Sequence, residues 1–139
     1  MKKNVTKKEL TDTLQRVQAE FENYRKRTNK EVMMIREMAS ESLVAKLLPV
    51  IDHFELAFKH KEENEFAKGM EMIFGQLKEI LEGEGLQEIQ QTSIFDPNLH
   101  EAIETVKSKK PGGTIIQVFQ KGYLFNNKLL RPAKVKVAK

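Results

Sequence analysis

Residues 5–48 decide the fold, and they read VTKKELTDTLQRVQAEFENYRKRTNKEVMMIREMASESLVAKLL. This stretch contains no glycine or proline and is rich in Lys, Glu, Arg, Gln and Met, which are all good helix formers. The simplest interpretation is one helix of roughly 40 residues, which at about 1.5 Å per residue would be about 60 Å long. The rest of the chain has to be arranged around that helix.

The apolar residues of this predicted helix recur with a period of eleven. Such a period corresponds to about 3.67 residues per turn, so two helices paired along the stripe would run nearly straight or slightly right-handed. The stripe is narrow, and pairing two copies of the chain would bury it. The pattern leaves open whether the paired helices are parallel or antiparallel. The predicted dimer contacts here are Leu10, Leu14, Val17, Phe21, Val32 and Leu43.

Pro49 is expected to bend or end the long helix, because proline removes a backbone donor. A short helical segment then runs over 51–60. A second amphipathic helix follows, with apolar residues at alternating steps of four and three, and Gly83 and Gly85 stop it. Two short helices from each of two copies would close a four-helix bundle. Its predicted dimer contacts are Phe66, Met70, Ile73 and Leu77.

After Gly85 the sequence changes to short, β-branched or alternating runs, which are typical of strands. Strands are expected at 86–89, 102–106, 114–121 and 134–137. Lys110-Pro111-Gly112-Gly113 reads as a turn, and Asn126-Asn127 reads as a tight hairpin because Asn tolerates positive φ.

The chain is therefore predicted to be α+β, with three parts. They are a long dimerising helix (1–48), short helices that form a dimeric four-helix bundle (49–85), and a small antiparallel β-domain (86–139).

Composition limits the protein class. The 139 residues are 32% charged and contain no cysteine, which excludes disulfides, thiolate metal sites and cysteine nucleophiles. No apolar run is long enough for a membrane span and the N-terminus has no apolar signal core, so a cytoplasmic protein is expected. Within 86–139 nine Lys and Arg face four Asp and Glu. This excess of positive charge favours either an acidic partner surface or nucleic acid.

Motifs of catalysis are absent from the sequence. His53, His60 and His100 are scattered, and no glycine-rich phosphate loop precedes a helix. We therefore expect no enzyme activity, metal or cofactor. The basic segment 23–30 could contact phosphates, although acidic neighbours partly cancel its charge. The methionines could form a binding groove but more often fill a core.

Several separate motifs resemble one known family. They are ENYRKRT at 22–28, LLPVID at 47–52, FDPNLHEAI at 95–103, KGY at 121–123 and LRPAKVKVAK at 130–139. In this order and spacing they resemble GrpE, the family of nucleotide-exchange factors, or co-chaperones, of DnaK-type chaperones. The resemblance extends over essentially the whole chain.

The resemblance implies a parallel homodimer that binds the ATPase domain of a DnaK-type chaperone in protein folding and the stress response. It opens the nucleotide cleft so that ADP leaves, and it need not touch the nucleotide itself. By position, the expected partner-binding residues are Arg25, Arg27, Gly69, Phe119, Lys128 and Val137.

Two positions depart from the family pattern. Asn127 stands where Gly, Asp or Glu is usual, and Lys128 stands where Arg is typical, so a planar bidentate contact is lost there while the charge remains. Two other functions stay open on the residues alone. One is a coiled-coil protein that binds nucleic acid through its basic segments, and the other is a holdase chaperone that uses its Met-rich helices.

Overall fold

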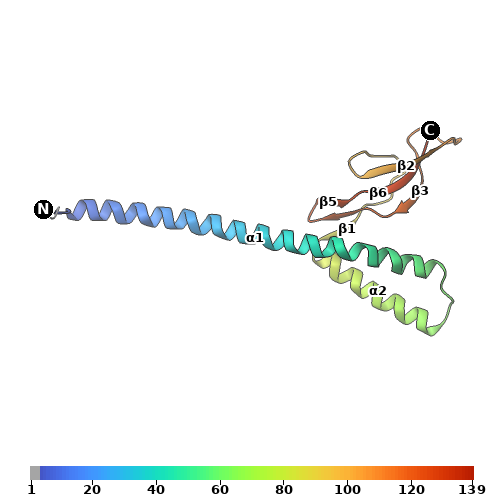
Figure 1. Cartoon of the computed structure of the whole chain (residues 1–139), viewed down its shortest axis with the longest axis horizontal. Coiled ribbons are helices and arrows are strands. Elements are labelled where there is room, and N and C mark those ends of the chain that lie inside the picture. The colour runs from blue at the N-terminus through green and yellow to red at the C-terminus, as the bar shows by residue number, and fades with distance from the viewer. Residues whose placement is uncertain (1–3) are drawn as a thin grey trace. The chain divides into compact units, whose positions relative to one another are not determined.

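The computed structural model describes residues 4–139 as two helices followed by six strands (Figure 1). The helices are α1 (Lys7–Lys59) and α2 (Glu65–Gly83). The strands are β1 (Leu86–Glu88), β2 (His100–Val106), β3 (Ile115–Gln120), β4 (Tyr123–Phe125), β5 (Lys128–Arg131) and β6 (Ala133–Ala138). The predicted α+β fold is confirmed. The chain divides into two compact units, Met1–Ser40 and Glu41–Lys139, so α1 contributes to both.

Helix α1 is longer than predicted, because it does not end at Pro49. It runs for 53 residues to Lys59 with the proline inside it, so of the two expected outcomes, a bend or an end, the end was wrong. The proline costs the helix one backbone hydrogen bond. Its neighbours Leu48 and Ile51 are almost fully buried, and their packing holds the helix on both sides of Pro49. Within residues 4–139 no helix is long and apolar enough to cross a membrane.

Local side-chain contacts set the starts of both helices. Before α1 the backbone N–H of Thr6 donates to the Glu9 carboxylate at 2.8 Å, and the N–H of Glu9 donates back to the Thr6 hydroxyl at 3.3 Å. This reciprocal capping box satisfies N–H groups that have no partner inside the helix. At the start of α2 the Asn64 side chain accepts a hydrogen bond from the N–H of Ala67 at 2.8 Å.

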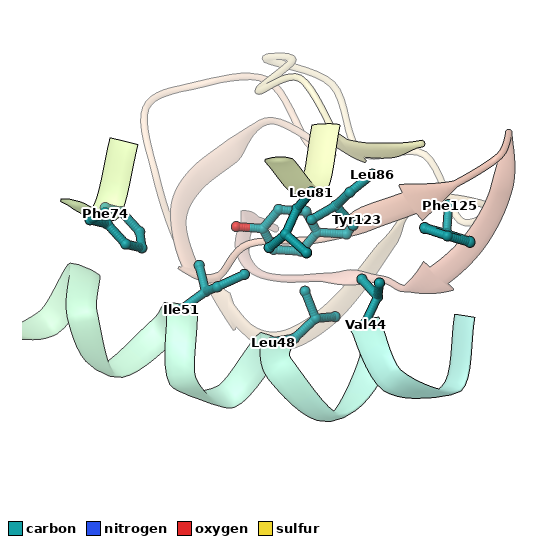
Figure 2. Close-up of a cluster of buried hydrophobic side chains, with 8 residues drawn as sticks. All are labelled: Val44, Leu48, Ile51, Phe74, Leu81, Leu86, Tyr123 and Phe125. Atoms are coloured by element: carbon teal, nitrogen blue, oxygen red, sulfur yellow. The ribbon is translucent and has the colours of Figure 1, made fainter. Parts of the chain in front are cut away.

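The main core lies where the C-terminal half of α1 meets α2 and the strands. Val44, Leu48 and Ile51 follow one another at steps of four and three, so they share one face of α1. Figure 2 shows these three side chains pointing toward Tyr123 and Phe125 of β4. Phe74 and Leu81 of α2 and Leu86 of β1 complete the cluster. Burial of these side chains fixes the β-domain (residues 86–139) on α1.

The β-domain contains two three-stranded sheets. One has the strand order β1-β4-β5 and is antiparallel, and the other has the order β2-β6-β3. The expected β-unit is confirmed, but β2 pairs with β6 in parallel while β3 pairs with β6 antiparallel. The parallel pair is possible because the connection from β2 to β6 is long and includes three other strands.

The predicted hairpin at Asn126-Asn127 is confirmed. It joins β4 to β5, and both residues have positive φ, 49° and 65°. Positive φ at both central positions is what a two-residue hairpin of type I′ requires, and Asn adopts it more readily than most residues.

A turn also forms at Asp96-Pro97-Asn98, and His100 anchors it. The N–H of Asp96 donates to Nδ1 of His100 at 2.9 Å, and the N–H of Asn98 donates to the Asp96 carboxylate at 2.9 Å. The imidazole is buried, with 5% of the residue exposed. His100 therefore serves as an interior acceptor that orients the start of β2.

Gly122 lies where two backbone segments pass unusually close. A methyl group at this position would collide with the backbone nitrogen of Ala133 and lie 2.6 Å from Cδ1 of Ile89 and 2.9 Å from the carbonyl carbon of Pro132. The carbonyl of Gly122 also accepts a hydrogen bond from the N–H of Ile89 at 2.9 Å. Only glycine allows the backbone just before β4 to come this close to the backbone at Pro132 and Ala133.

We expect Gly122→Ala to lower the free energy of unfolding by about 1–3 kcal/mol, because the backbone around Ala133 has to move. Urea unfolding followed by circular dichroism at one protein concentration measures this. Gly75→Ala is the matched control, since a methyl there meets no described atom within 4 Å, and it should be neutral or stabilise α2 by up to about 1 kcal/mol. Equal effects of the two substitutions would contradict the close approach.

Candidate partner-binding site

Charged side chains concentrate where the β-domain meets the C-terminal half of α1. Across residues 4–139 no group of three or more His, Cys, Asp or Glu is arranged to hold a metal ion. Instead, three acidic residues of α1 each face a basic residue of the β-domain: Asp52 faces Arg131, Glu55 faces Lys121 and Glu41 faces Lys128. Both members of each pair lie in the unit Glu41–Lys139.

The pair between Asp52 and Arg131 is bidentate. Nη1 of Arg131 donates to one carboxylate oxygen of Asp52 at 2.7 Å, and Nη2 donates to the other at 2.6 Å. Nε of Arg131 donates to the carbonyl of Lys121 at 2.9 Å, and the guanidinium lies 5.3 Å from the ring centroid of Tyr123. The guanidinium thus joins α1, β4 and β5, which one planar group with a fixed fork of donors can do.

The pKa of Asp52 reflects this contact. Partial burial alone would raise the pKa, but the hydrogen bonds and the positive charge of Arg131 outweigh burial, and Gln120 adds a hydrogen bond at 3.3 Å. The net effect holds the pKa of Asp52 below its ordinary value. The carboxylate is therefore ionised at neutral pH and stabilises the folded state in that form.

Lys121 makes a second link between the β-domain and α1. Its ammonium lies 2.9 Å from the carboxylate of Glu55 and 3.5 Å from that of Glu88. Burial lowers the pKa of Lys121, but the hydrogen bond to Glu55 and the negative charge of Glu88 outweigh it, so the pKa is raised. The same surroundings raise the pKa of Tyr123, mainly through burial and then through Glu55 and Glu88.

Lys128 forms the third and most exposed link. It is the first residue of β5, immediately after the hairpin turn, and its ammonium lies 3.3 Å and 3.5 Å from the two carboxylate oxygens of Glu41. Lys128 was predicted to contact a partner. The structure leaves most of its side chain in solvent while Glu41 holds the ammonium.

Phe119, a second predicted contact residue, lies on β3 in the other sheet. It lines a groove of about 700 Å³ between α1, α2 and β3, together with Phe58 and Phe74. The ammonium of Lys136 lies 5.4 Å from the centroid of its ring. Phe119 and Lys128 are therefore both at the surface but belong to different sheets.

Val137 is part of the second core cluster. It is 8% exposed on β6 and packs with Ala133 and Val135 against Phe95, Ile115 and Val118. A role of Val137 in partner binding stays a prediction, and the structure gives its side chain a packing role.

The other predicted partner residues lie on helices. Arg25 and Arg27 are exposed on α1, where Arg27 lies 4.0 Å from Glu31 and over the ring of Tyr24. Gly69 is exposed on α2, and a methyl at this position would meet no described atom within 4 Å.

The predicted dimer residues fall into two groups. Leu77 packs against the core of its own chain, and Met70 is half-buried. The others are large apolar side chains left exposed on α1 and α2. They are Leu10, Leu14, Val17, Phe21, Val32, Leu43, Phe66 and Ile73.

The acidic partners of the β-domain were not predicted from the sequence. Asp52 and Arg131 both lie in stretches that carried the family resemblance, at 47–52 and 130–139, but 79 positions separate them. The available signal was the excess positive charge of 86–139, which favoured either an acidic surface or nucleic acid. Part of that surface is α1 of the same chain.

The fold defines an α+β protein, in which a long helix carries a small β-domain held by apolar packing and ion pairs. The family model that matches is GrpE, over residues 1–139, and the chain belongs to the GrpE family.

Curated relatives agree with this assignment. Protein GrpE of Caldanaerobacter subterraneus is 44% identical over 136 residues, which are 95% of this chain and 66% of the relative. Protein GrpE of Campylobacter curvus is 44% identical over 94% of this chain and 76% of its own length. Protein GrpE of Geobacillus stearothermophilus is 41% identical over 88% of this chain and 58% of its own length. The chain thus spans between 58% and 76% of the length of these relatives.

We expect Asp52→Asn to lower the free energy of unfolding at pH 7 by about 1–3 kcal/mol, because Arg131 loses its charged acceptor while staying partly solvated. The folded pKa of Asp52 is depressed, so its contribution is complete above the ordinary Asp pKa of about 4 and is lost as the pH falls below it. The difference between wild type and variant should shrink in acid. Denaturant unfolding between about pH 3 and pH 7 measures both effects.

Asp12→Asn is the control, since it makes the same chemical change on an exposed position of α1. It should change the free energy of unfolding by no more than about 0.5 kcal/mol. An Asp52→Asn effect that stays constant across this pH range would rule out the ionised pair as its cause.

Proposed function

We propose that this protein is an adenyl-nucleotide exchange factor for a DnaK-type chaperone of the cytoplasm, active in protein folding and the stress response. It binds the ATPase domain of that chaperone through its β-domain, opens the nucleotide cleft and promotes the release of ADP. Membership of the GrpE family supports this proposal. It acts without catalytic chemistry of its own and without direct contact to the nucleotide.

The observation that carries the proposal is the fixed position of the β-domain on α1. The core around Tyr123 and the pair between Asp52 and Arg131 hold this domain, while Lys128 and Phe119 stay at its surface. In a domain fixed in this way, the surface groups keep their positions relative to α1 when a partner binds.

Release of ADP then follows from a population shift. A factor that binds the open cleft more tightly than the closed one shifts the chaperone toward the open state, and ADP loses its contacts there. A preference of about 3 kcal/mol changes this equilibrium by roughly a hundredfold. Stopped-flow release of a fluorescent ADP analogue from a cognate chaperone, with and without this protein, tests the proposal. Unchanged release rates would refute it.

We expect Lys128→Glu to slow stimulated ADP release at least about tenfold, because it places a negative charge against an acidic partner surface and beside Glu41. The control is Lys109→Glu, which makes the same charge change in the connection between β2 and β3. Circular dichroism checks that both variants fold. Equal rates for the two variants would remove Lys128 from the proposed site.

We further propose that the active form is a parallel homodimer paired along the apolar stripe of α1. Leu10, Phe21 and Val32 are spaced by eleven residues, and between 40% and 60% of each is exposed. Such regularly spaced apolar residues on an isolated helix favour burial against another helix. The exposed Phe66 and Ile73 of α2 extend the proposed contact into a four-helix bundle.

We expect Phe21→Asp to raise the dimer dissociation constant at least about tenfold, because it places a charge in an apolar contact. Sedimentation velocity over a range of protein concentrations measures the shift. Gln15→Asp is the control, since it introduces the same residue into α1 outside the predicted contacts. If Phe21→Asp sediments like the control, α1 does not pair through this stripe.

A further inference from the structure

The three ion pairs between α1 and the β-domain differ in which partner is accessible. In the pair of Arg131 with Asp52, the cation is 16% exposed and the anion 27%. In the pair of Lys121 with Glu55, the values are 32% and 20%. In the third pair Lys128 is 71% exposed, whereas Glu41 is 26% exposed. Lys128 is thus by far the most exposed of the three cations.

The geometry of the third pair allows it to exchange partners. Lys128 contacts both oxygens of Glu41 at 3.3 Å and 3.5 Å through a flexible four-carbon side chain. An ion pair with such an exposed member contributes little to stability, since water screens it. Arg131 is different, because it is bound at both nitrogens of its fork and at Nε. Lys128 can therefore leave its carboxylate while Arg131 keeps the domain in place.

The backbone at Lys128 stays fixed during such an exchange. Asn126 and Asn127 hold the turn in the left-handed region, and Lys128 pairs with Phe125, which is buried in the core. The N–H of Asn126 also donates to the carbonyl of Gly85 at 3.0 Å. Only the lysine side chain has to rotate, so releasing Glu41 costs little beyond the ion pair itself.

We propose that Glu41 acts as an internal competitor for the partner-binding lysine. In the free protein it occupies Lys128 as a stand-in for the acidic surface of the partner, and binding replaces it. Glu41 is then an affinity-setting residue, since every productive encounter first displaces its carboxylate. This inference rests on the proposed function, because it assumes that Lys128 meets an acidic patch on a DnaK-type ATPase domain.

The test is a double-mutant cycle of Glu41→Gln and Lys128→Gln. The affinity of each full-length variant for the nucleotide-free ATPase domain is measured by biolayer interferometry at low salt. Glu41→Gln should raise the affinity about two- to fivefold, the range set by the strength of an exposed ion pair. Lys128→Gln should lower it, and adding Glu41→Gln to Lys128→Gln should then change it by no more than about 1.5-fold, since no lysine is left to release.

Glu84→Gln is the matched control for net charge. It removes one carboxylate beside Gly85, which bonds to the same hairpin, and Glu84 is exposed. Thermal melts verify that every variant is folded. An increase in affinity of the same size with Glu84→Gln, or one that persists without Lys128, means that overall charge is responsible and overturns the inference.

The cycle separates this inference from the proposed function. If wild type binds the ATPase domain and accelerates ADP release but Glu41→Gln binds like wild type, the internal competitor is wrong and the exchange function stands. If wild type neither binds nor accelerates release, both are wrong.

Discussion

The contact between Asp52 and Arg131 is the constraint on which the rest of the structure depends. One carboxylate on α1 receives both nitrogens of the guanidinium fork, and the third nitrogen of that group bonds to the carbonyl of Lys121. A strand, a neighbouring loop and a helix are thereby held in one arrangement. The apolar cluster beside it stabilises the contact, but apolar burial does not depend on orientation. The bidentate ion pair does, so it fixes how the β-domain is oriented on α1.

The same contact explains how the charge of the chain is used. Residues 86–139 carry the excess of positive charge, and within them Arg131 and Lys121 form ion pairs with acidic residues of α1. Charge counted along a sequence therefore overstates what is offered to partners. What matters for binding is how exposed each cation stays after folding, and of the three that face α1 the most exposed is Lys128.

Local rules predicted much of the β-domain, since the deciding residues are neighbours in sequence. Asn126 and Asn127 identified the hairpin, because Asn tolerates the positive φ that both residues adopt. The helix through Pro49 was missed because distant side chains hold it, which a local rule for proline cannot register. The pairing of Asp52 with Arg131 was missed for the same reason, since nothing near either residue indicates the other.

The partner-binding role of the candidate residues stays a prediction, but the structure shows where each of them lies. Position in the family pattern singled out Lys128 and Phe119, and both lie at the surface, but it equally singled out Val137, whose side chain is buried. A pattern records that a residue type is required and does not say whether packing or binding requires it. Burial in the folded chain shows that Val137 has a packing role, and its partner-binding role stays a prediction.

The period of eleven in α1 organises two faces at once. Leu43 belongs to the apolar stripe, while Glu41 and Asp52, also eleven residues apart, face the β-domain. Two residues along an α-helix turn by about 200°, so Leu43 and Glu41 lie on nearly opposite sides of α1. A second helix packed on Leu43 would therefore leave the pair of Glu41 and Lys128 open to solvent. The proposed dimer contact at Leu43 and the proposed partner contact at Lys128 would therefore not compete for the same surface.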